Sequence, residues 1–391
     1  MTTISITTAT PTRDRVELIG LGALIGMVAA AQLSIAVSQI LLTVAALCWV
    51  ASHVARAERI EAPDFFWPLI AYASLTLLSA GFSRNPAVSL GDCKQLALFL
   101  LIPIVYDFAR GSRAGTVLTI VLTAGAASAL VGIVQYSILN FDTLDRRVQG
   151  TLSHWMTYSG TLMLVICAAV ARLLYGTRDR GWAAVVIPAL VVSLVVTFTR
   201  TAMVGLAAGV GVLFLLRDFR LLAILPIALA AALALSPADL TRRIYSIADL
   251  NDPTSKDRVA MLQAGVAIIK DHPLTGVGPD MVKHVYPDYR VPTALMAVTP
   301  HLHNVPMQIA AERGIPALAA WLWFVVATLR ALRRQFTRTR ARMFAAMGLG
   351  TFAAMLTAGL FEYNFGDSEF LMLFLVLITL PFAADRDGGL P

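Results

Sequence analysis

Long apolar runs recur along this chain and leave few folds open to it. Runs of 15 to 25 mostly apolar residues follow one another through most of the 391-residue sequence. Each is long enough to cross a hydrocarbon core about 30 Å thick as a helix. Only 14% of the residues are charged, whereas a soluble globular domain has about 25%. A β-barrel would show alternating segments of about 10 residues instead. The sequence therefore predicts an all-α polytopic membrane protein.

The apolar runs predict about twelve transmembrane helices in a single integral membrane domain, residues 1–391. One polar segment, residues 236–303, separates the ninth span from the tenth and is expected to form a large loop. The first span could be misread as a signal peptide, but an uncleaved helix is favoured because apolar sequence resumes directly after Ser34. The predicted spans are 17–33, 35–53, 65–81, 95–109, 115–139, 156–175, 182–197, 201–216, 221–235, 305–330, 342–360 and 369–384.

The distribution of Lys and Arg predicts the orientation. Of 31 such residues, 18 fall in segments on one side of the predicted bundle and 5 in short segments on the other. The remaining 8 lie in or just after the long loop, where the positive-inside rule loses force. Both termini are therefore expected in the cytoplasm and the long loop outside. The net charge of +7 mostly reflects this bias and gives no reason to expect a nucleic-acid partner.

No motif for a resident cofactor or metal is evident. Cys48, Cys93 and Cys167 are scattered, and their spacing fits neither a disulfide framework nor a zinc site. No phosphate-binding loop is found. The aspartates of the long loop are spread along it rather than clustered. They are Asp239, Asp249, Asp252, Asp257, Asp271, Asp280 and Asp288.

The long loop contains a predicted helix. Thr254 or Ser255 can cap its start, and "DHP" at 271–273 ends it. The helix is amphipathic and is expected to lie on the outer membrane surface against the bundle. "GVG" follows, where Gly276 and Gly278 allow a tight turn or the close approach of a ligand. The apolar positions at helical spacing are Val259, Leu262, Val266 and Ile269.

The stretch "HLHNVPMQ" at 301–308 predicts how the tenth span begins. Pro306 suits the first turn of a helix, and Asn304 is a good N-cap before it. His303 then stands at the outer mouth of the span, beside a helix N-terminus that favours anions. His301, two residues further out, is interpreted as a loop histidine.

A polar stripe is expected to continue from this cap into the membrane. Asn304, Gln308 and Glu312 are spaced at i, i+4 and i+8, so they share one face of the helix. Such a stripe normally faces a bundle interior or a water-filled cavity. For Asn304 the interpretation as a plain helix cap is favoured.

Several basic residues are predicted on the same outer side. Arg200 lies inside an apolar tract that is too long for one span, so a helical hairpin with Arg200 near its turn is expected. Arg147 and His154 both precede the sixth span, seven residues apart. Arg258 lies near the start of the loop helix. Arginines gathered beside a histidine suggest an anion site, because a guanidinium pairs well with phosphate.

Four of these segments together resemble the O-antigen ligase and O-antigen polymerase superfamily. The resemblance covers residues 147–318 by its motifs, and the twelve-span topology extends it over most of the chain. It does not separate ligases from polymerases. The segments are "RVQGTLSH", "TFTRTA", "DRVAMLQAGVAIIKDHPLTGVG" and "HNVPMQIAAERGIPA".

The resemblance implies a substrate and a place. The donor would be a glycan on undecaprenyl diphosphate, the acceptor a sugar hydroxyl of lipid A–core, and the location the periplasmic face of the inner membrane. The fold would resemble the C-type glycosyltransferases. The basic residues of the family map onto Arg200, Arg258 and Arg147, and its essential loop histidine maps onto His303. His154 stands at a polar position without an assigned role.

The residues suit direct, inverting, metal-independent transfer. Arginines can stabilise the departing diphosphate, and a neutral imidazole can take the acceptor's proton. Three alternatives stay open: an O-antigen polymerase, a protein O-oligosaccharyltransferase, and a transporter. A transporter should carry ionisable or helix-breaking residues near mid-bilayer in corresponding halves, whereas the charges here gather at helix ends.

Overall fold

The computed structural model describes residues 11–56, 59–143, 146–227, 230, 252–338 and 341–386. Within these ranges the chain is helical and contains no named strand. The elements are α1 (Pro11–Ala30), α2 (Ile35–Arg56), α3 (Phe66–Gly81), α4 (Pro86–Asp92), η1 (Cys93–Leu100), α5 (Leu101–Phe108), α6 (Arg113–Ser137), α7 (Trp155–Tyr175), α8 (Arg180–Val195), α9 (Arg200–Arg217), η2 (Phe219–Ala223), α12 (Pro253–Asp271), α13 (Val282–Tyr289), α14 (Val305–Arg338), α15 (Arg342–Gly359), η3 (Asn364–Gly366) and α16 (Ser368–Asp385).

The length and composition of the helices make this a multi-pass membrane protein. Among the described residues, 7 helical segments are long and apolar enough to cross a membrane, and α3 and α8 are shorter apolar helices. The 7 segments include the continuous stretch Pro86–Phe108, which joins α4, η1 and α5. Each predicted span overlaps a described helix, although residues 228–229 and 231–235 of the span 221–235 lie outside the described residues. The number of twelve crossings stays a prediction.

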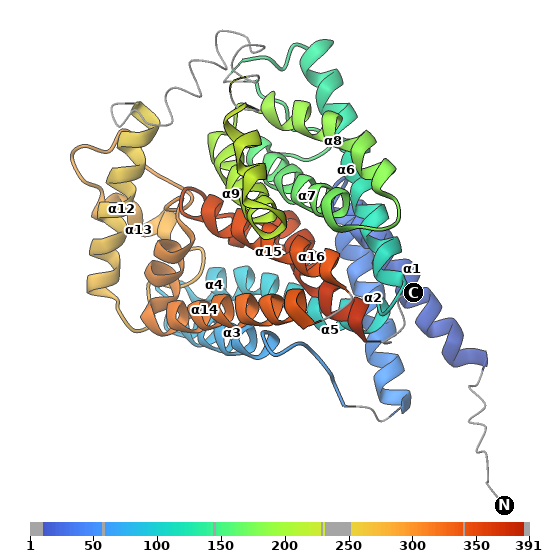
Figure 1. The fold of residues 1–391 in the computed structure, drawn as a ribbon. Helices are drawn as coiled ribbons and strands as arrows, with labels where there is room; N and C mark the ends of the chain where they lie inside the picture. The colour runs from blue at the N-terminus through green and yellow to red at the C-terminus, as the bar shows by residue number, and fades with distance from the viewer. Residues whose placement is uncertain are drawn as a thin grey trace, which may run out of the picture.

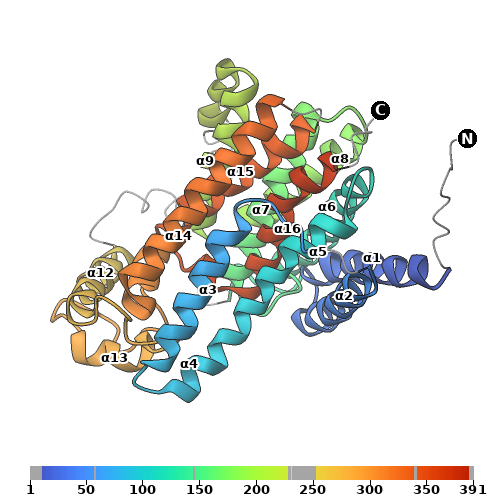
Figure 2. The same ribbon diagram turned by 90° about the horizontal axis from the view of Figure 1, so that it is seen from below.

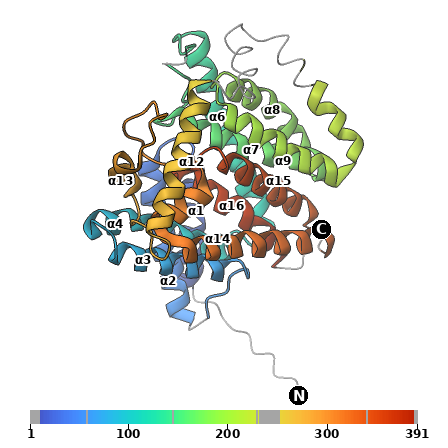
Figure 3. The ribbon, with the colours of Figure 1, turned by 90° about the vertical axis from the view of Figure 1, so that its left-hand side faces the viewer.

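The bundle is built around α16. Side chains along almost its whole length are buried, and α7 and α15 lie beside it in Figures 1 and 2. The paired helices α1 and α2 stand at one side, and α12 and α13 at the opposite side (Figure 1). Figure 3 views the molecule from the α12 side and shows this helix running across the ends of its neighbours.

Several helices begin or end at the same end of the bundle. The N-termini of α7, α9, α14 and α16 meet the C-terminus of α15 there. The opposite end carries ion pairs of residues predicted on the inner side: Arg110 and Arg113 bond Glu17 at 2.6 and 2.7 Å, and Arg386 bonds Glu61 at 2.7 Å. The end that holds the helix starts is therefore the one predicted to face outward.

The loop helix forms as predicted, with a different cap. Asp252, rather than Thr254 or Ser255, caps α12 by accepting from the backbone N–H groups of both. The reason is that Pro253 occupies the first helical position, which places the cap at Asp252, two residues before Thr254. The helix ends at Asp271 as expected.

Only part of the apolar stripe expected on α12 is buried: Ile269 packs against a small apolar cluster, and Leu262 is half-buried. Val259 and Val266 are exposed, whereas Met261, Ala264 and Ile268 are buried in a small apolar cluster with residues of α13 and α14. The buried face of α12 is therefore offset from the predicted stripe.

The "GVG" turn packs backbone to backbone against α14. Gly276 and Gly278 have φ of 65° and 106°, so the predicted positive φ is confirmed. The N–H groups of Val277 and Gly278 donate to the carbonyls of Ala311 and Glu312 at 3.0 and 2.8 Å. Neither glycine lines the cavities described below; both lie in this packing contact.

Gly314 interrupts α14 next to that contact. Its φ of 82° and ψ of 168° are not helical, and a Cβ there would lie 2.1 Å from the carbonyl oxygen of Leu274. Glycines therefore allow the backbones of "DHPLTGVG" and "ERG" to lie in direct contact. This contact fixes the position of the loop relative to the first turns of α14.

Gly276→Ala is expected to destabilise the protein strongly. The added Cβ would lie 2.2 Å from the carbonyl carbon of Glu312, and the left-handed backbone adds strain of roughly 1–3 kcal/mol. The control is Gly115→Ala, because a Cβ at Gly115 meets no atom within 4 Å. Melting of the detergent-solubilised protein measures the effect. Equal melting temperatures for the two variants would contradict the packing described here.

Candidate active site

Two cavities adjoin at the end of the bundle where the helix starts meet. The arginine cavity has a volume of about 290 Å³ and is lined by Arg200, Thr201, Val204, Ser255, Arg258, Val259, Leu262, Leu302, His303, Leu360 and Phe361. The acidic cavity has a volume of about 190 Å³ and is lined by His154, Met156, Thr157, Ser159, Gly160, Met163, Thr201, Ala202, His301, Ala358, Glu362, Tyr363, Asn364, Gly366, Asp367 and Phe370. Thr201 lines both.

Arg200 enters the arginine cavity from the predicted hairpin. Helix α8 ends at Val195 and α9 begins at Arg200, so the turn lies where the apolar tract was expected to fold back. The Arg200 side chain is 8% exposed, and its Nη2 pairs with Asp252 Oδ1 at 3.2 Å. This ion pair ties the start of α9 to the cap of α12.

Arg258 reaches the same cavity from the second turn of α12. Ser255, Arg258 and Leu262 follow helical spacing and face it together. Burial lowers the pKa of the Arg258 guanidinium, while the nearby carboxylate of Glu362 raises it. Its Nε is buried and has no hydrogen-bond partner among the described residues. A cationic group with an unmet donor is suited to receive an anion.

His303 lines the arginine cavity and is held by a carboxylate. Its Nδ1 lies 2.8 Å from Oε2 of Glu362, which follows α15. The backbone of His303 has a φ of 51°, an unusual value for a residue other than glycine. Glu362 contacts Nδ1 and not Nε2 of His303. This is the arrangement of a histidine whose ring is oriented by a carboxylate.

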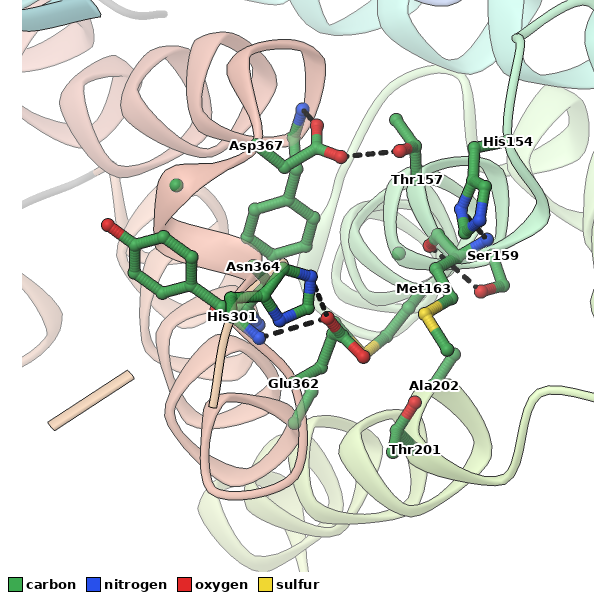
Figure 4. Close-up of a pocket in the computed structure, with 16 residues that line it drawn as sticks. His154, Thr157, Ser159, Met163, Thr201, Ala202, His301, Glu362, Asn364 and Asp367 are labelled. Atoms are coloured by element: carbon green, nitrogen blue, oxygen red, sulfur yellow. Dashed lines mark hydrogen bonds and ion pairs between the residues drawn. The ribbon is translucent and has the colours of Figure 1, made fainter. Parts of the chain in front are cut away.

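His301 joins the same cluster from the other cavity. Its Nε2 lies 3.5 Å from Oε1 of Glu362, and its ring lies 4.2 Å from that of His303. His301 lies in a loop as interpreted, but it is not isolated there, because both histidine rings lie beside the Glu362 carboxylate. Figure 4 shows His301 and Glu362 facing His154 and Thr157 across the acidic cavity.

Charges within this cluster shift two pKa values. Burial raises the pKa of Glu362, but the hydrogen bond with His303 and the charges of His303, His301 and Arg258 lower it to about 2. Burial lowers the pKa of His301 to about 4, although Glu362 opposes the shift. Near neutral pH Glu362 is therefore a carboxylate and His301 a neutral imidazole.

His154 caps the neighbouring helix. Its Nδ1 accepts from the backbone N–H of Met156 at 3.2 Å, and its ring stacks on Trp155 at 4.1 Å. Burial lowers the pKa of His154, with Glu362 and Asp367 opposing the shift. Arg147 lies over the Trp155 ring at 5.1 Å and lines neither cavity. The structure thus brings His154 to the acidic cavity but does not bring Arg147 to the arginine cavity.

The predicted polar stripe at the start of α14 supports the backbone around the site. Asn304 is the predicted cap, since its Oδ1 accepts from the N–H of Met307 at 2.9 Å. Gln308 accepts from the N–H of Leu302 at 2.7 Å, and Glu312 bonds Arg313 at 2.7 Å. Gln308 and Glu312 are only 1% and 2% exposed and line neither cavity. The stripe positions the segment that carries the two histidines.

The His–Glu cluster is also a conceivable metal site. Ligand atoms of His301, His303 and Glu362 lie within 4.8 Å of one another, and two histidines with one carboxylate can bind zinc. Two ligands of one tetrahedral zinc ion would be about 3.3 Å apart. The His303–Glu362 separation of 2.8 Å is instead that of a hydrogen bond.

The sequence was compared with known families and curated proteins. Residues 183–322 match the family model described as O-antigen ligase (Wzy_C). Over these residues the chain is similar to the O-antigen ligase family, which supports the resemblance to that superfamily. Members are glycosyltransferase-like enzymes of lipopolysaccharide biosynthesis. No curated protein matches. The matched segment of the O-antigen ligase family holds Arg200, Arg258, His301 and His303, whereas Glu362 lies beyond it.

The acidic half of this site was not predicted from the sequence. Glu362 and Asp367 lie in "FEYNFGDSEF", between α15 and α16 and directly after the predicted eleventh span. The sequence feature that could have predicted this half is the pair of acidic residues between two apolar helices. It lies on the side of the membrane that is predicted to carry the histidines. Carboxylates at helix ends near a histidine should have been considered as its partners.

The stability of the protein is expected to fall between pH 6.5 and pH 4 partly through His301. Its pKa of about 4 in the folded protein compares with about 6.5 in an unfolded chain. In this window the unfolded chain binds a proton that the folded protein does not, so lowering the pH favours unfolding. Glu362, with a pKa of about 2, stays ionised throughout.

His301→Gln should therefore lose less melting temperature than the wild type between pH 7.5 and pH 4.5. His284→Gln serves as the control, because His284 is an exposed histidine on α13. The account of His301 would be wrong if His301→Gln lost as much melting temperature as the wild type and the His284 control.

Proposed function

We propose that this protein is an O-antigen ligase. It transfers a glycan from undecaprenyl diphosphate to a sugar hydroxyl of lipid A–core. The reaction takes place at the periplasmic face of the inner membrane, and both termini lie in the cytoplasm. The observation that carries the proposal is the arginine cavity, in which two guanidinium groups and a carboxylate-held histidine converge.

The arginine cavity supports the assignment of the donor. A lipid diphosphate needs cationic groups for its head and an apolar surface for its chain. Arg200 and Arg258 supply the charge, and Val259, Leu262 and Phe361 belong to the same lining. The unmet Nε donor of Arg258 is the group best placed to respond to the charge that develops on the departing diphosphate.

The reaction proceeds by direct displacement at the anomeric carbon of the donor. The acceptor oxygen forms a bond to this carbon as the bond to the diphosphate oxygen breaks, so the configuration inverts. The diphosphate leaves with the bonding electron pair and is stabilised by Arg200 and Arg258. The acceptor's proton passes to Nε2 of His303. Glu362 accepts the Nδ1–H bond and stabilises the imidazolium that forms.

Metal-independent transfer is part of the proposal. The two arginines carry the charge that a divalent ion would otherwise balance, and Nδ1 of His303 is engaged by Glu362 at hydrogen-bond distance. Transfer should keep its rate in EDTA. Loss of transfer that zinc restores would make the His301, His303 and Glu362 cluster a metal site.

The competing functions predict different products from one reconstitution. Purified protein in nanodiscs receives lipid-linked glycan with and without lipid A–core, and products are separated on a gel. Glycan joined to lipid A–core supports the ligase. Longer lipid-linked glycan formed without core would indicate a polymerase, and glycan on a Ser- or Thr-containing acceptor protein would indicate an oligosaccharyltransferase. In vesicles, movement of substrate without transfer would indicate a transporter.

A further inference from the structure

The acidic cavity differs chemically from the arginine cavity beside it. Its lining contains two carboxylates, Glu362 and Asp367, and no arginine or lysine. A diphosphate would meet negative charge there, whereas an uncharged ligand rich in hydroxyl groups would find acceptors. Glu362 lies 2.8 Å from His303 and 3.5 Å from His301, so the two cavities meet at the group proposed to hold the base.

Two buried polar atoms of this lining lack partners. Nδ1 of His301 and Oδ1 of Asn364 are buried and make no hydrogen bond to any described residue. Asn364 is 7% exposed, and its Nδ2 already donates to the carbonyl of Met355 at 3.2 Å. Leaving such atoms unmet costs free energy. A bound ligand with hydroxyl groups would satisfy both.

Asp367 and Thr157 add hydrogen-bonding capacity on the facing wall. One oxygen of Asp367 accepts from the N–H of Phe370 and caps α16, and the other accepts from the hydroxyl of Thr157 (Figure 4). A carboxylate offers about four lone-pair directions, so Asp367 retains acceptor capacity toward the cavity.

Apolar surface lies between these polar groups. Met163, Tyr363 and Phe370 belong to the lining together with the carboxylates and hydroxyls. One water takes about 30 Å³ of liquid volume, so a cavity of about 190 Å³ has room for a few waters or one small polar ring. Polar edges around an apolar face match a sugar ring, which has hydroxyls at its edge and C–H groups on its faces.

We propose that the acidic cavity binds one uncharged sugar ring at the reacting end of a substrate, through Asp367, Thr157, Asn364 and His301. This inference rests on the proposed transfer function and extends it by assigning the saccharide its own subsite. The ring belongs either to the transferred glycan or to the acceptor, since both offer the same hydroxyl chemistry. The position beside Glu362 places it next to the base.

Kinetics of two conservative variants test the subsite. Asp367→Asn keeps a helix cap, because Asn caps helices as well as Asp, but turns one acceptor into a donor. Thr157→Val keeps the shape and removes the hydroxyl. Each should raise the KM of one substrate about threefold to tenfold, as expected for a lost buried hydrogen bond, with little change in kcat. A rise for lipid-linked glycan assigns the ring to the donor, and a rise for lipid A–core assigns it to the acceptor.

Thr157→Ser keeps the hydroxyl and should restore the wild-type KM. The control is His284→Asn on exposed α13, and melting temperatures show whether each variant is folded. Unchanged KM values for both substrates in folded Asp367→Asn and Thr157→Val would overturn the subsite.

Direct binding separates this inference from the proposed function. If the wild type formed no product, calorimetry would be carried out with lipid-linked glycan and with core oligosaccharide freed from lipid A. Binding that Asp367→Asn weakens would keep the sugar subsite while the ligase assignment fell. Absence of binding of either probe to the wild type would overturn the subsite as well.

Discussion

His303→Ala is expected to lower the rate of glycan transfer about 100-fold or more while the protein still folds and binds its donor. The reduction is the size expected for the loss of a general base. His303→Asn should not restore the rate, because an amide cannot accept the proton. Single-turnover measurements with saturating donor isolate the chemical step. The exposed His284→Ala is the matched control and should keep the wild-type rate.

A variant of Glu362 tests the same proton transfer to His303. Glu362→Gln keeps the shape of the side chain that contacts His303 at 2.8 Å but removes its negative charge. We expect a slower rate than the wild type and a faster rate than His303→Ala, since the imidazole remains while its protonated form loses stabilisation. If His303→Ala kept its rate and His301→Ala lost it, the base would be His301 instead.

Arg258→Ala is expected to lower transfer at least tenfold. Charged hydrogen bonds contribute about 1.5–3 kcal/mol, and Arg258 has a buried donor that no described residue satisfies. Arg258→Lys should restore activity only partly, because an ammonium lacks the paired donors of guanidinium. Initial rates at varied donor concentration measure the effect. Lys270→Ala, an exposed change in the last turn of the same helix, is the control.

Arg200→Ala should give a similar loss, and a second variant tests its cause. Because Arg200 also pairs with Asp252 at 3.2 Å, the loss could reflect a displaced α12 rather than a missing charge. Asp252→Asn weakens the ion pair and keeps the helix cap. It should retain more activity than Arg200→Ala. Wild-type rates in both Arg200→Ala and Arg258→Ala would refute the diphosphate site.

Most of the helical framework and the basic half of the site could be predicted from the sequence. Apolar length fixes where membrane helices form, and local chemistry fixes their starts: Asn304 caps α14, and Arg200 begins α9 after a turn. Glycine at positive φ is equally local, so the turn at Gly276 and Gly278 was predictable. These features depend on neighbours within a few residues.

The acidic half could not be predicted in the same way, because it depends on contacts between distant segments. Glu362 meets His303 across 59 positions, and Asp367 meets Thr157 across 210. The partner of His301 likewise comes from another helix end. The face of α12 that packs inward also differs in part from the predicted stripe, because Met261, Ala264 and Ile268 are buried against α13 and α14 together with Ile269.

Release of undecaprenyl diphosphate during a single turnover tests the central claim most directly. Purified protein in nanodiscs is mixed with lipid-linked glycan and lipid A–core in EDTA, and the released lipid and the joined glycan are quantified together. We expect the wild type to release one undecaprenyl diphosphate for each glycan joined to core, and His303→Ala and Arg258→Ala to release far less in the same time. Transfer that proceeds equally in the wild type and in both folded variants would contradict the account.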